Sequence, residues 1–238
     1  MTAPHFFAED VSGDRVTLSR EDSRHGLRVL RLRPGEAVTI SDGAGAVVDA
    51  TVGDDPERLV GYVTARRVEE RPHPAIHVAQ AIPKKGKLDL VVQKLTELGV
   101  ASIRPFAGSR SIPRWGAEKG ASQAERLRDV ARQAAMQSRR AWLPAVLAPV
   151  PAEVVALEGS AIVLHESAAT RLTEALPGDP PGSVTIVVGP EGGLSEQEVS
   201  VFAERGAVAV TLGPVILRTE TAGLAAVAVV SARYGQLG

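Results

Sequence analysis

The strongest constraint on the fold is a change in the spacing of apolar residues partway along the chain. Up to residue 70, short β-branched or alternating runs are separated by turn residues such as Asp42-Gly43, which predicts a small β-rich unit. From Ala75 onward, each apolar run is followed by an amphipathic one, which predicts a mostly parallel α/β sheet. We therefore expect a β domain over 1–70 and an α/β domain over 75–238, joined by a proline-containing linker at 69–74.

Individual elements follow from periodicity and capping signals. In the first unit we expect strands at 15–18, 37–41, 47–52 and 59–68, and a short helix that Ser19 opens and that continues through 25–32. In the second we expect strands at 76–82, 100–106, 161–165, 183–188 and 207–212, and helices at 88–98, 121–140, 195–206 and 219–234. Gly99 should end the helix over 88–98, whose apolar residues recur at i, i+3, i+4 and i+7.

Charge is unevenly distributed, although the net charge is only −1. Residues 1–70 carry 9 basic and 13 acidic side chains, residues 71–145 carry 14 and 5, and residues 146–238 carry 4 and 10. A basic middle block can neutralise phosphates and release their counterions, which is the main source of nonspecific RNA affinity. Such a run is also typical of a solvated helix face, so the charge favours an RNA partner without deciding it.

Composition excludes several kinds of chemistry. The chain has no cysteine, which rules out disulfides, thiolate metal sites and a Cys nucleophile. The longest apolar stretch, near 222–230, is far shorter than the roughly 20 residues that span a bilayer, and no secretory signal opens the sequence, so we expect a cytoplasmic protein without membrane or metal partners. The hydrolase motifs Gly-x-Ser-x-Gly and His-Glu-x-x-His are both absent from the sequence.

Two loops are candidates for ligand binding. The glycine-rich segment 187–195 lies between a predicted strand and a capped helix, where backbone N–H groups can approach a ligand, although a simple tight turn would use the same residues. The segment 211–222 also follows a predicted strand and carries Arg218 where a helix should begin. A cation at a helix N-terminus is electrostatically unfavourable. This favours an active-site role for Arg218 over its alternative, an ion pair with Glu220 or Glu191.

Several segments together resemble one known family. They are His25-Gly-Leu-Arg-Val-Leu-Arg, Asp42-Gly, Lys84-Lys-Gly-Lys-Leu-Asp89, Thr96-Glu-Leu-Gly-Val, Gln137-Ser-x-Arg140, Gly189-Pro-Glu-Gly-Gly193 and Leu217-Arg-Thr-Glu-Thr-Ala222. In this order and spacing they resemble the bacterial 16S ribosomal RNA uridine-N3-methyltransferases of the SPOUT superfamily, over nearly the whole chain. The resemblance implies an α/β fold: a parallel sheet with a deep trefoil knot in the C-terminal part, after a PUA-like β-barrel at the N-terminus.

The same resemblance implies a site for S-adenosylmethionine. Its residues would be Leu164, His165, Glu166, Gly189, Pro190, Glu191, Gly193, Leu212, Gly213, Ile216, Leu217 and Arg218. Arg218 would also act in catalysis, because a permanently charged guanidinium can stabilise negative charge that develops on a uracil carbonyl. Glu220 is the candidate proton acceptor, with Glu191 as the open alternative.

The RNA partner would be 16S ribosomal RNA, within the small ribosomal subunit. Its candidate contacts are His5, Arg24, Arg28, Lys84, Lys85, Lys87, Arg132, Gln137, Ser138 and Arg140; His5 stands where this family usually has an arginine. The final helix is rich in Ala, Gly and Val, which suits either a homodimer interface, as the family implies, or packing within one subunit. Two alternative functions remain open: a non-catalytic RNA-binding or ribosome-assembly protein of this fold, and a ribose 2′-O-methyltransferase.

Overall fold

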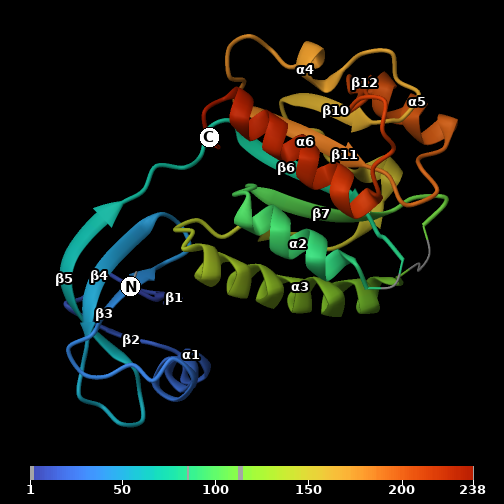
Figure 1. Cartoon of the computed structure of the whole chain (residues 1–238). Helices are drawn as coiled ribbons and strands as arrows, with labels where there is room; N and C mark the ends of the chain where they lie inside the picture. The colour runs from blue at the N-terminus through green and yellow to red at the C-terminus, as the bar shows by residue number, and fades with distance from the viewer. Residues whose placement is uncertain (1–2, 85, 112–114, 238) are drawn as a thin grey trace. The chain divides into compact units, whose positions relative to one another are not determined.

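Figure 1 shows the computed structural model of the chain, which describes residues 3–84, 86–111 and 115–237. The chain forms two compact units. The first comprises Met1–Arg71 together with Gln133–Leu143, and the second comprises Pro72–Arg132 together with Pro144–Gly238. The return of 133–143 to the first unit has no signal in the sequence pattern, because it depends on contacts between distant segments.

The first unit is a five-stranded sheet with a short helix. Its strands lie in the order β1-β3-β4-β5-β2, and the β1–β3 pair is parallel. Their bounds are β1 (His5–Phe7), β2 (Arg15–Thr17), β3 (Ala37–Ser41), β4 (Ala46–Val52) and β5 (Val60–Val68). The four expected strands are present within about two residues of their predicted ends. β1 was missed, because three residues are too few to display an alternating pattern.

The predicted helix of the first unit begins as expected and ends earlier. The Ser19 side chain accepts a hydrogen bond from the backbone N–H of Asp22 and opens α1 (Arg20–Arg24). A single π-helical turn, η1 (His25–Val29), continues it. Arg31 then adopts a left-handed backbone, φ 57°, so the helix does not reach residue 32.

The segment 133–143 completes the first unit. Ala135 and Met136, from the end of α3 (Ala117–Ser138), belong to its apolar core beside Phe6 and Ile40. The backbone beyond α3 is tied to β3, since the Ser41 hydroxyl donates to the Ala141 carbonyl at 2.9 Å. The first unit therefore includes a segment that begins 65 positions after the end of its last strand.

The second unit is a parallel sheet covered by helices, which confirms the predicted fold class (Figure 1). The main strand order is β12-β10-β11-β6-β7-β8, and β9 pairs with β7. The strands are β6 (Ala75–Ala81), β7 (Ser102–Ala107), β8 (Ala145–Val146), β9 (Val150–Pro151), β10 (Ser160–Leu164), β11 (Ser183–Val188) and β12 (Val208–Val210). The helical elements besides α3 are α2 (Leu88–Glu97), η2 (Ala152–Val154), α4 (Leu172–Ala175), α5 (Glu196–Glu204) and α6 (Thr219–Arg233).

The expected elements of this unit are confirmed, with small shifts at their ends. The short elements β8, β9, η2 and α4 carry too few residues for a periodic signal, and sequence reasoning missed them. α2 buries Leu88, Val91, Val92 and Leu95 in the main core, and Gly99 follows it with the left-handed φ of 80° that its C-terminus requires. The trefoil knot stays a prediction.

Candidate active site

The candidate site lies at one end of three adjacent parallel strands. β10 pairs with β11 on one side and with β12 on the other, and all three run in the same direction. The loops that follow them, 164–167, 189–194 and 211–218, line one cavity of about 760 Å³. Ligands of open α/β sheets bind at the carboxyl ends of strands, and this volume lies within the usual range for a small-molecule site.

The structure brings all of the predicted cofactor-binding residues to this cavity. The lining includes Leu164, His165, Glu166, Gly189, Pro190, Glu191, Gly193, Leu212, Gly213, Ile216, Leu217 and Arg218. These residues come from three segments up to 54 positions apart, and only the parallel pairing of the strands collects them. Their shared location is a fact of the fold; their contact with cofactor remains a prediction.

The glycine loop has a fixed backbone shape. The Gly193 N–H donates to the Pro190 carbonyl at 2.9 Å, and Gly193 has a left-handed φ of 69°. Thr219, the first residue of α6, is buried and donates its hydroxyl hydrogen to the Gly189 carbonyl at 2.5 Å. The same hydroxyl accepts a hydrogen bond from Gln80 of β6. The loop is thus held by its own turn and by the start of α6.

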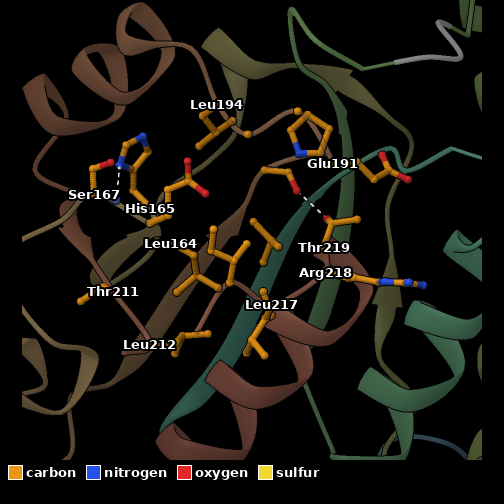
Figure 2. A pocket seen from close by; sticks show the side chains of 18 of the residues that line it. Leu164, His165, Ser167, Glu191, Leu194, Thr211, Leu212, Leu217, Arg218 and Thr219 are labelled. Carbon is orange, nitrogen blue, oxygen red and sulfur yellow. Dashed lines mark hydrogen bonds between the residues drawn. The ribbon is translucent and has the colours of Figure 1, made fainter. Parts of the chain in front are cut away.

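Apolar and charged side chains occupy different parts of the cavity (Figure 2). Leu164, Leu212 and Leu217 lie close together on one side, while Arg218 and Glu191 extend away from them on the other. The arrangement supplies an apolar slot beside a charged rim. The slot suits a flat aromatic base, and the rim suits a polar reacting group.

Lys87 organises the charges of the rim. Its ammonium lies 2.7 Å from Oε1 of Glu220 and 4.0 Å from Oε1 of Glu191. This hydrogen bond is the main reason that the pKa of Glu220 is lowered, with Arg218 contributing at longer range, so the carboxyl group is ionised at neutral pH. Neither glutamate pairs with Arg218, which makes no ion pair within the described ranges. The alternative interpretation of Arg218 as an ion-pair partner is therefore not supported.

Glu220 is close to the cavity without lining it. It is the second residue of α6, and its Oε2 atom is buried with no hydrogen-bond partner in the part of the chain that the structure describes. Glu191 lines the cavity, and its Oε1 accepts a hydrogen bond from the backbone N–H of Lys84 at 2.9 Å. Both candidate proton acceptors thus lie at the Lys87 end of the site.

The cavity fits S-adenosylmethionine by the chemistry of its donors. Adenine requires an apolar slot with a few backbone hydrogen bonds, and the three leucines with the loop backbone at 212–217 supply both. The glycines at 189, 192 and 193 leave backbone groups accessible without Cβ atoms in front of them. Among residues the structure describes, no cluster of His, Asp or Glu suits a metal ion, and no helix has the length and apolar character needed to cross a membrane.

The candidate RNA contacts of the second unit have different environments. Lys84 is exposed, Lys87 is partly buried in the ion pair described above, and Arg132 on α3 is half-buried. Lys85 lies outside the described residues. Lys87 is one of the predicted RNA contacts and also lines the cavity. Its contact with RNA stays a prediction.

Part of the basic block stabilises the fold. Arg126 forms a bidentate ion pair with Asp89, in which Nη1 and Nη2 donate to the two carboxylate oxygens at 2.5 and 2.7 Å. This hydrogen bonding lowers the pKa of Asp89. Arg128 donates to the Val146 carbonyl. These side chains link α3 to α2 and to β8, so the excess of charge in this segment overstates the cation surface available to RNA.

The candidate RNA contacts of the first unit differ in how far they are exposed to solvent. Arg24, Arg28 and Gln137 are exposed, whereas the Ser138 hydroxyl is bonded to the Ala134 carbonyl inside α3. Burial lowers the pKa of Arg140, and Glu69 opposes that effect.

His5 is buried and neutral. Its Nδ1 atom lies 2.8 Å from the Thr39 hydroxyl, and only 6% of the residue is exposed. Burial is the largest cause that lowers its pKa to about 4; the Arg140 backbone opposes it, and the charges of Arg67 and Arg139 add to it. A cationic contact from His5 to phosphate at neutral pH is not supported by this environment.

Sequence reasoning missed some residues of the cavity. Arg110 lines it from the loop after β7, and Thr219 fixes the glycine loop. Nothing in the local sequence marks Arg110, because its place depends on the contact between the loop after β7 and the glycine loop. Thr219 lies inside the Leu217-Arg-Thr-Glu-Thr-Ala222 motif, so the signal for it was present.

Comparison with known proteins agrees with this geometry. A family model described as an RNA methyltransferase domain matches residues 69–231, and one described as an RNA methyltransferase PUA domain matches residues 18–60. The fold and the cavity therefore define an RNA methyltransferase with an N-terminal PUA domain.

Individual relatives narrow this class. The chain is 33% identical to ribosomal RNA small subunit methyltransferase E of Mycobacterium bovis, over 98% of this chain and 94% of that protein. It is 31% identical to the Bacillus subtilis protein of the same name, over 90% and 89%. A crystal structure of the Neisseria gonorrhoeae protein of that name, bound to S-adenosyl methionine, superposes with a TM-score of 0.87 at 32% identity over 98% of both chains. The chain belongs to the ribosomal RNA small subunit methyltransferase E family.

Proposed function

We propose that this protein methylates N3 of one uridine in 16S ribosomal RNA, with S-adenosylmethionine as the methyl donor. It is a ribosomal RNA methyltransferase that uses S-adenosylmethionine, in keeping with its family and with the solved relative bound to that cofactor. The observation that carries the proposal is the convergence of three loops on a single cavity at the carboxyl ends of β10, β11 and β12.

Arg218 is proposed to stabilise the charge that develops on the base. When bound, the cofactor supplies an electrophilic methyl group on a sulfonium, which N3 of uracil can accept only after its imide proton has left. Loss of that proton places negative charge on the neighbouring carbonyl oxygens. Arg218 lies at the charged rim, exposed and without an ion-pair partner in the described ranges, and its guanidinium presents several donors to such an oxygen.

Glu220 is proposed as the proton acceptor, and Glu191 is the alternative. Glu220 is held as a carboxylate by Lys87, and its Oε2 atom has no hydrogen-bond partner within the described residues. The lowered pKa makes Glu220 a weaker base, so its contribution to the rate must come mainly from how the carboxylate is positioned towards the imide proton. Comparing Glu220→Gln with Glu191→Gln separates the two, because the acceptor's loss lowers kcat and the other's loss does not.

The partner and assembly state are part of the proposal. Exposed cations at Arg24, Arg28 and Lys84, with Gln137, support RNA contact from both units, and the substrate places the protein in the cytoplasm. α6 carries a half-buried stripe of Leu224, Ala225, Ala228 and Val229, which supports pairing of two copies through this helix. A stable, active monomer at low concentration would contradict the dimer.

Methyl transfer can be tested directly. Small ribosomal subunits from cells that lack the protein are incubated with purified protein and S-adenosylmethionine labelled on the methyl group, and the labelled nucleoside is identified by mass spectrometry. The proposal expects N3-methyluridine at one position. Label on a ribose would instead indicate a 2′-O-methyltransferase, and cofactor binding without transfer would indicate a ribosome-assembly protein.

A further inference from the structure

The loop after β7 brings an arginine to the cofactor cavity from outside the three main loops. Arg110 lines the cavity, and its Nη1 atom donates to the Gly192 carbonyl at 2.9 Å and lies 3.5 Å from the Leu194 carbonyl. A Cβ atom placed on Gly192 would come within 3.4 Å of the Arg110 Cβ atom. Arg110 is therefore in direct contact with the glycine loop.

The guanidinium of Arg110 has an unused edge. Its Nε and Nη2 atoms make no hydrogen bond within the described ranges, and no carboxylate there pairs with it. That edge of an arginine binds a carboxylate through two parallel hydrogen bonds. Lys87 of the cavity is already paired with Glu220, whereas Arg110 keeps this edge of its guanidinium unpaired within the described residues.

A buried carboxylate holds the Arg110 loop in place. Glu198 of α5 is 8% exposed, and its Oε1 accepts the Ser109 N–H at 2.7 Å. Its Oε2 accepts the Ser109 hydroxyl at 2.9 Å and both the N–H and the hydroxyl of Ser195, at 2.8 and 2.9 Å. Burial raises the pKa of Glu198, but these hydrogen bonds outweigh burial and lower it.

The Glu198 bonds join two segments that border the cavity. Ser195 closes the glycine loop and caps α5, while Ser109 immediately precedes Arg110. Sequence alone identifies the Ser195–Glu198 capping box, and that helix cap would need only Ser195. The bonds to Ser109 have no part in capping, which indicates that Glu198 also fixes where Arg110 lies.

We propose that Arg110 binds the α-carboxylate of S-adenosylmethionine, and that Glu198 is the positioning residue that holds Arg110 against the glycine loop. The apolar slot of Leu164, Leu212 and Leu217 takes the adenine, which leaves the amino-acid end of the cofactor for the glycine loop and Arg110. This inference rests on the proposed assignment of the cavity as the cofactor site.

A cofactor analogue makes the inference testable. Decarboxylated S-adenosylmethionine keeps the adenosine and the sulfonium and lacks only the carboxylate. Calorimetry on the full chain should show that the wild-type protein binds S-adenosylmethionine at least about tenfold more tightly than the analogue, the range expected for a hydrogen-bonded charge pair. In Arg110→Ala the two affinities should become equal, through loss of affinity for the cofactor alone.

The matched control is Arg205→Ala. Arg205 also donates to two backbone carbonyls, those of Glu153 and Val155, and does not line the cavity. It should keep the wild-type ratio of affinities. If Arg110→Ala also keeps that ratio, the proposal is overturned, and if it only reduces the salt dependence of RNA binding, Arg110 contacts phosphate instead.

The positioning role of Glu198 has its own readout. Glu198→Gln replaces one acceptor oxygen by a donor that faces Ser195 or Ser109. In an otherwise wild-type protein it should lower the ratio of the affinity for S-adenosylmethionine to the affinity for the decarboxylated analogue. In Arg110→Ala the same substitution should leave that ratio unchanged. Ser109→Ala is the milder variant and should shift the ratio in the same direction if Glu198→Gln fails to fold. A wild-type ratio in both variants would overturn the positioning role. A wild-type protein that binds neither compound would instead refute the cofactor site itself.

Discussion

The cavity at the carboxyl ends of β10, β11 and β12 and the group of arginines around His5 are built in different ways. The cavity collects three continuous loops, each directly after a buried strand. The cluster around His5 brings together Arg67, Arg139 and Arg140, from segments more than sixty positions apart. The first arrangement follows from parallel strand pairing, whereas the second exists only because 133–143 returns to the first unit.

The pKa values of ionisable groups are also shifted by different causes in the two regions. In the cavity, Lys87 is neutralised by Glu220, and the pKa of the glutamate falls. In the first unit, burial and two arginine charges push His5 towards its neutral form. Among the arginines around His5, Arg67 is already paired with Asp49 and Glu69.

The largest effect should come from the cavity. Arg218→Ala should lower kcat by about 10²–10³, the range for removing one donor that stabilises developing negative charge. Affinity for S-adenosylmethionine should change little, since the backbone supplies most of the predicted contacts. Single-turnover methylation measures the rate, and calorimetry measures the affinity for S-adenosylmethionine. An Arg218→Ala variant that methylates at the wild-type rate would refute the assigned role.

The next effect belongs to the first unit and depends on pH. The folded pKa of His5, about 4, lies below its ordinary value of 6.5, so below pH 6.5 the unfolded chain binds a proton that the folded chain does not. The stability that His5 contributes is complete above pH 6.5 and is lost as pH falls towards 4, by about 3 kcal/mol in total.

His5→Gln should remove this pH dependence, because glutamine does not titrate. The unfolding midpoint of the wild-type chain should therefore fall more between pH 7.5 and pH 5 than that of the variant. An NMR titration of the ring gives the pKa directly, and a value near 6.5 would contradict the buried, neutral His5.

A smaller effect tests the shape of the glycine loop. Gly193→Ala places a Cβ atom at a left-handed backbone position and should weaken S-adenosylmethionine binding about five- to thirtyfold. Gly206→Ala is the matched control, because Gly206 has a φ of 89°, open space around it and no place in the cavity. It should destabilise the fold by a similar amount and leave the affinity unchanged. Equal affinity losses in both variants would mean that the loop has no special role.

The smallest effect separates cations that bind RNA from cations that hold the fold. Arg140→Ala should reduce the slope of log affinity against log salt by about 0.7–0.9, as expected when one phosphate contact is lost. Arg126→Ala should leave that slope unchanged, because Arg126 is already paired with Asp89. Filter binding to ribosomal RNA at several salt concentrations measures the slope for each variant. A slope that changes in Arg126→Ala and not in Arg140→Ala would contradict the assignment of Arg140 to RNA and of Arg126 to the fold.

Most of the second unit was predictable, because its elements are long and periodic. α2, β11 and the capping box of α5 follow from local patterns, and resemblance gave the residues that line the cavity. β1 and the place of 133–143 were not predictable, since they depend on pairing between distant segments. Arg110 was missed for the same reason. The ion pair of Lys87 with Glu220 was not predictable either, because the two residues are 133 positions apart.

Mass-spectrometric mapping of ribosomal RNA from cells with and without this protein measures the proposed methylation in the cell. We expect one N3-methyluridine to disappear from 16S ribosomal RNA when the protein is absent, and we expect the wild-type protein to restore it while Arg218→Ala does not. An unchanged methylation map in cells without the protein would refute the proposed methyl transfer.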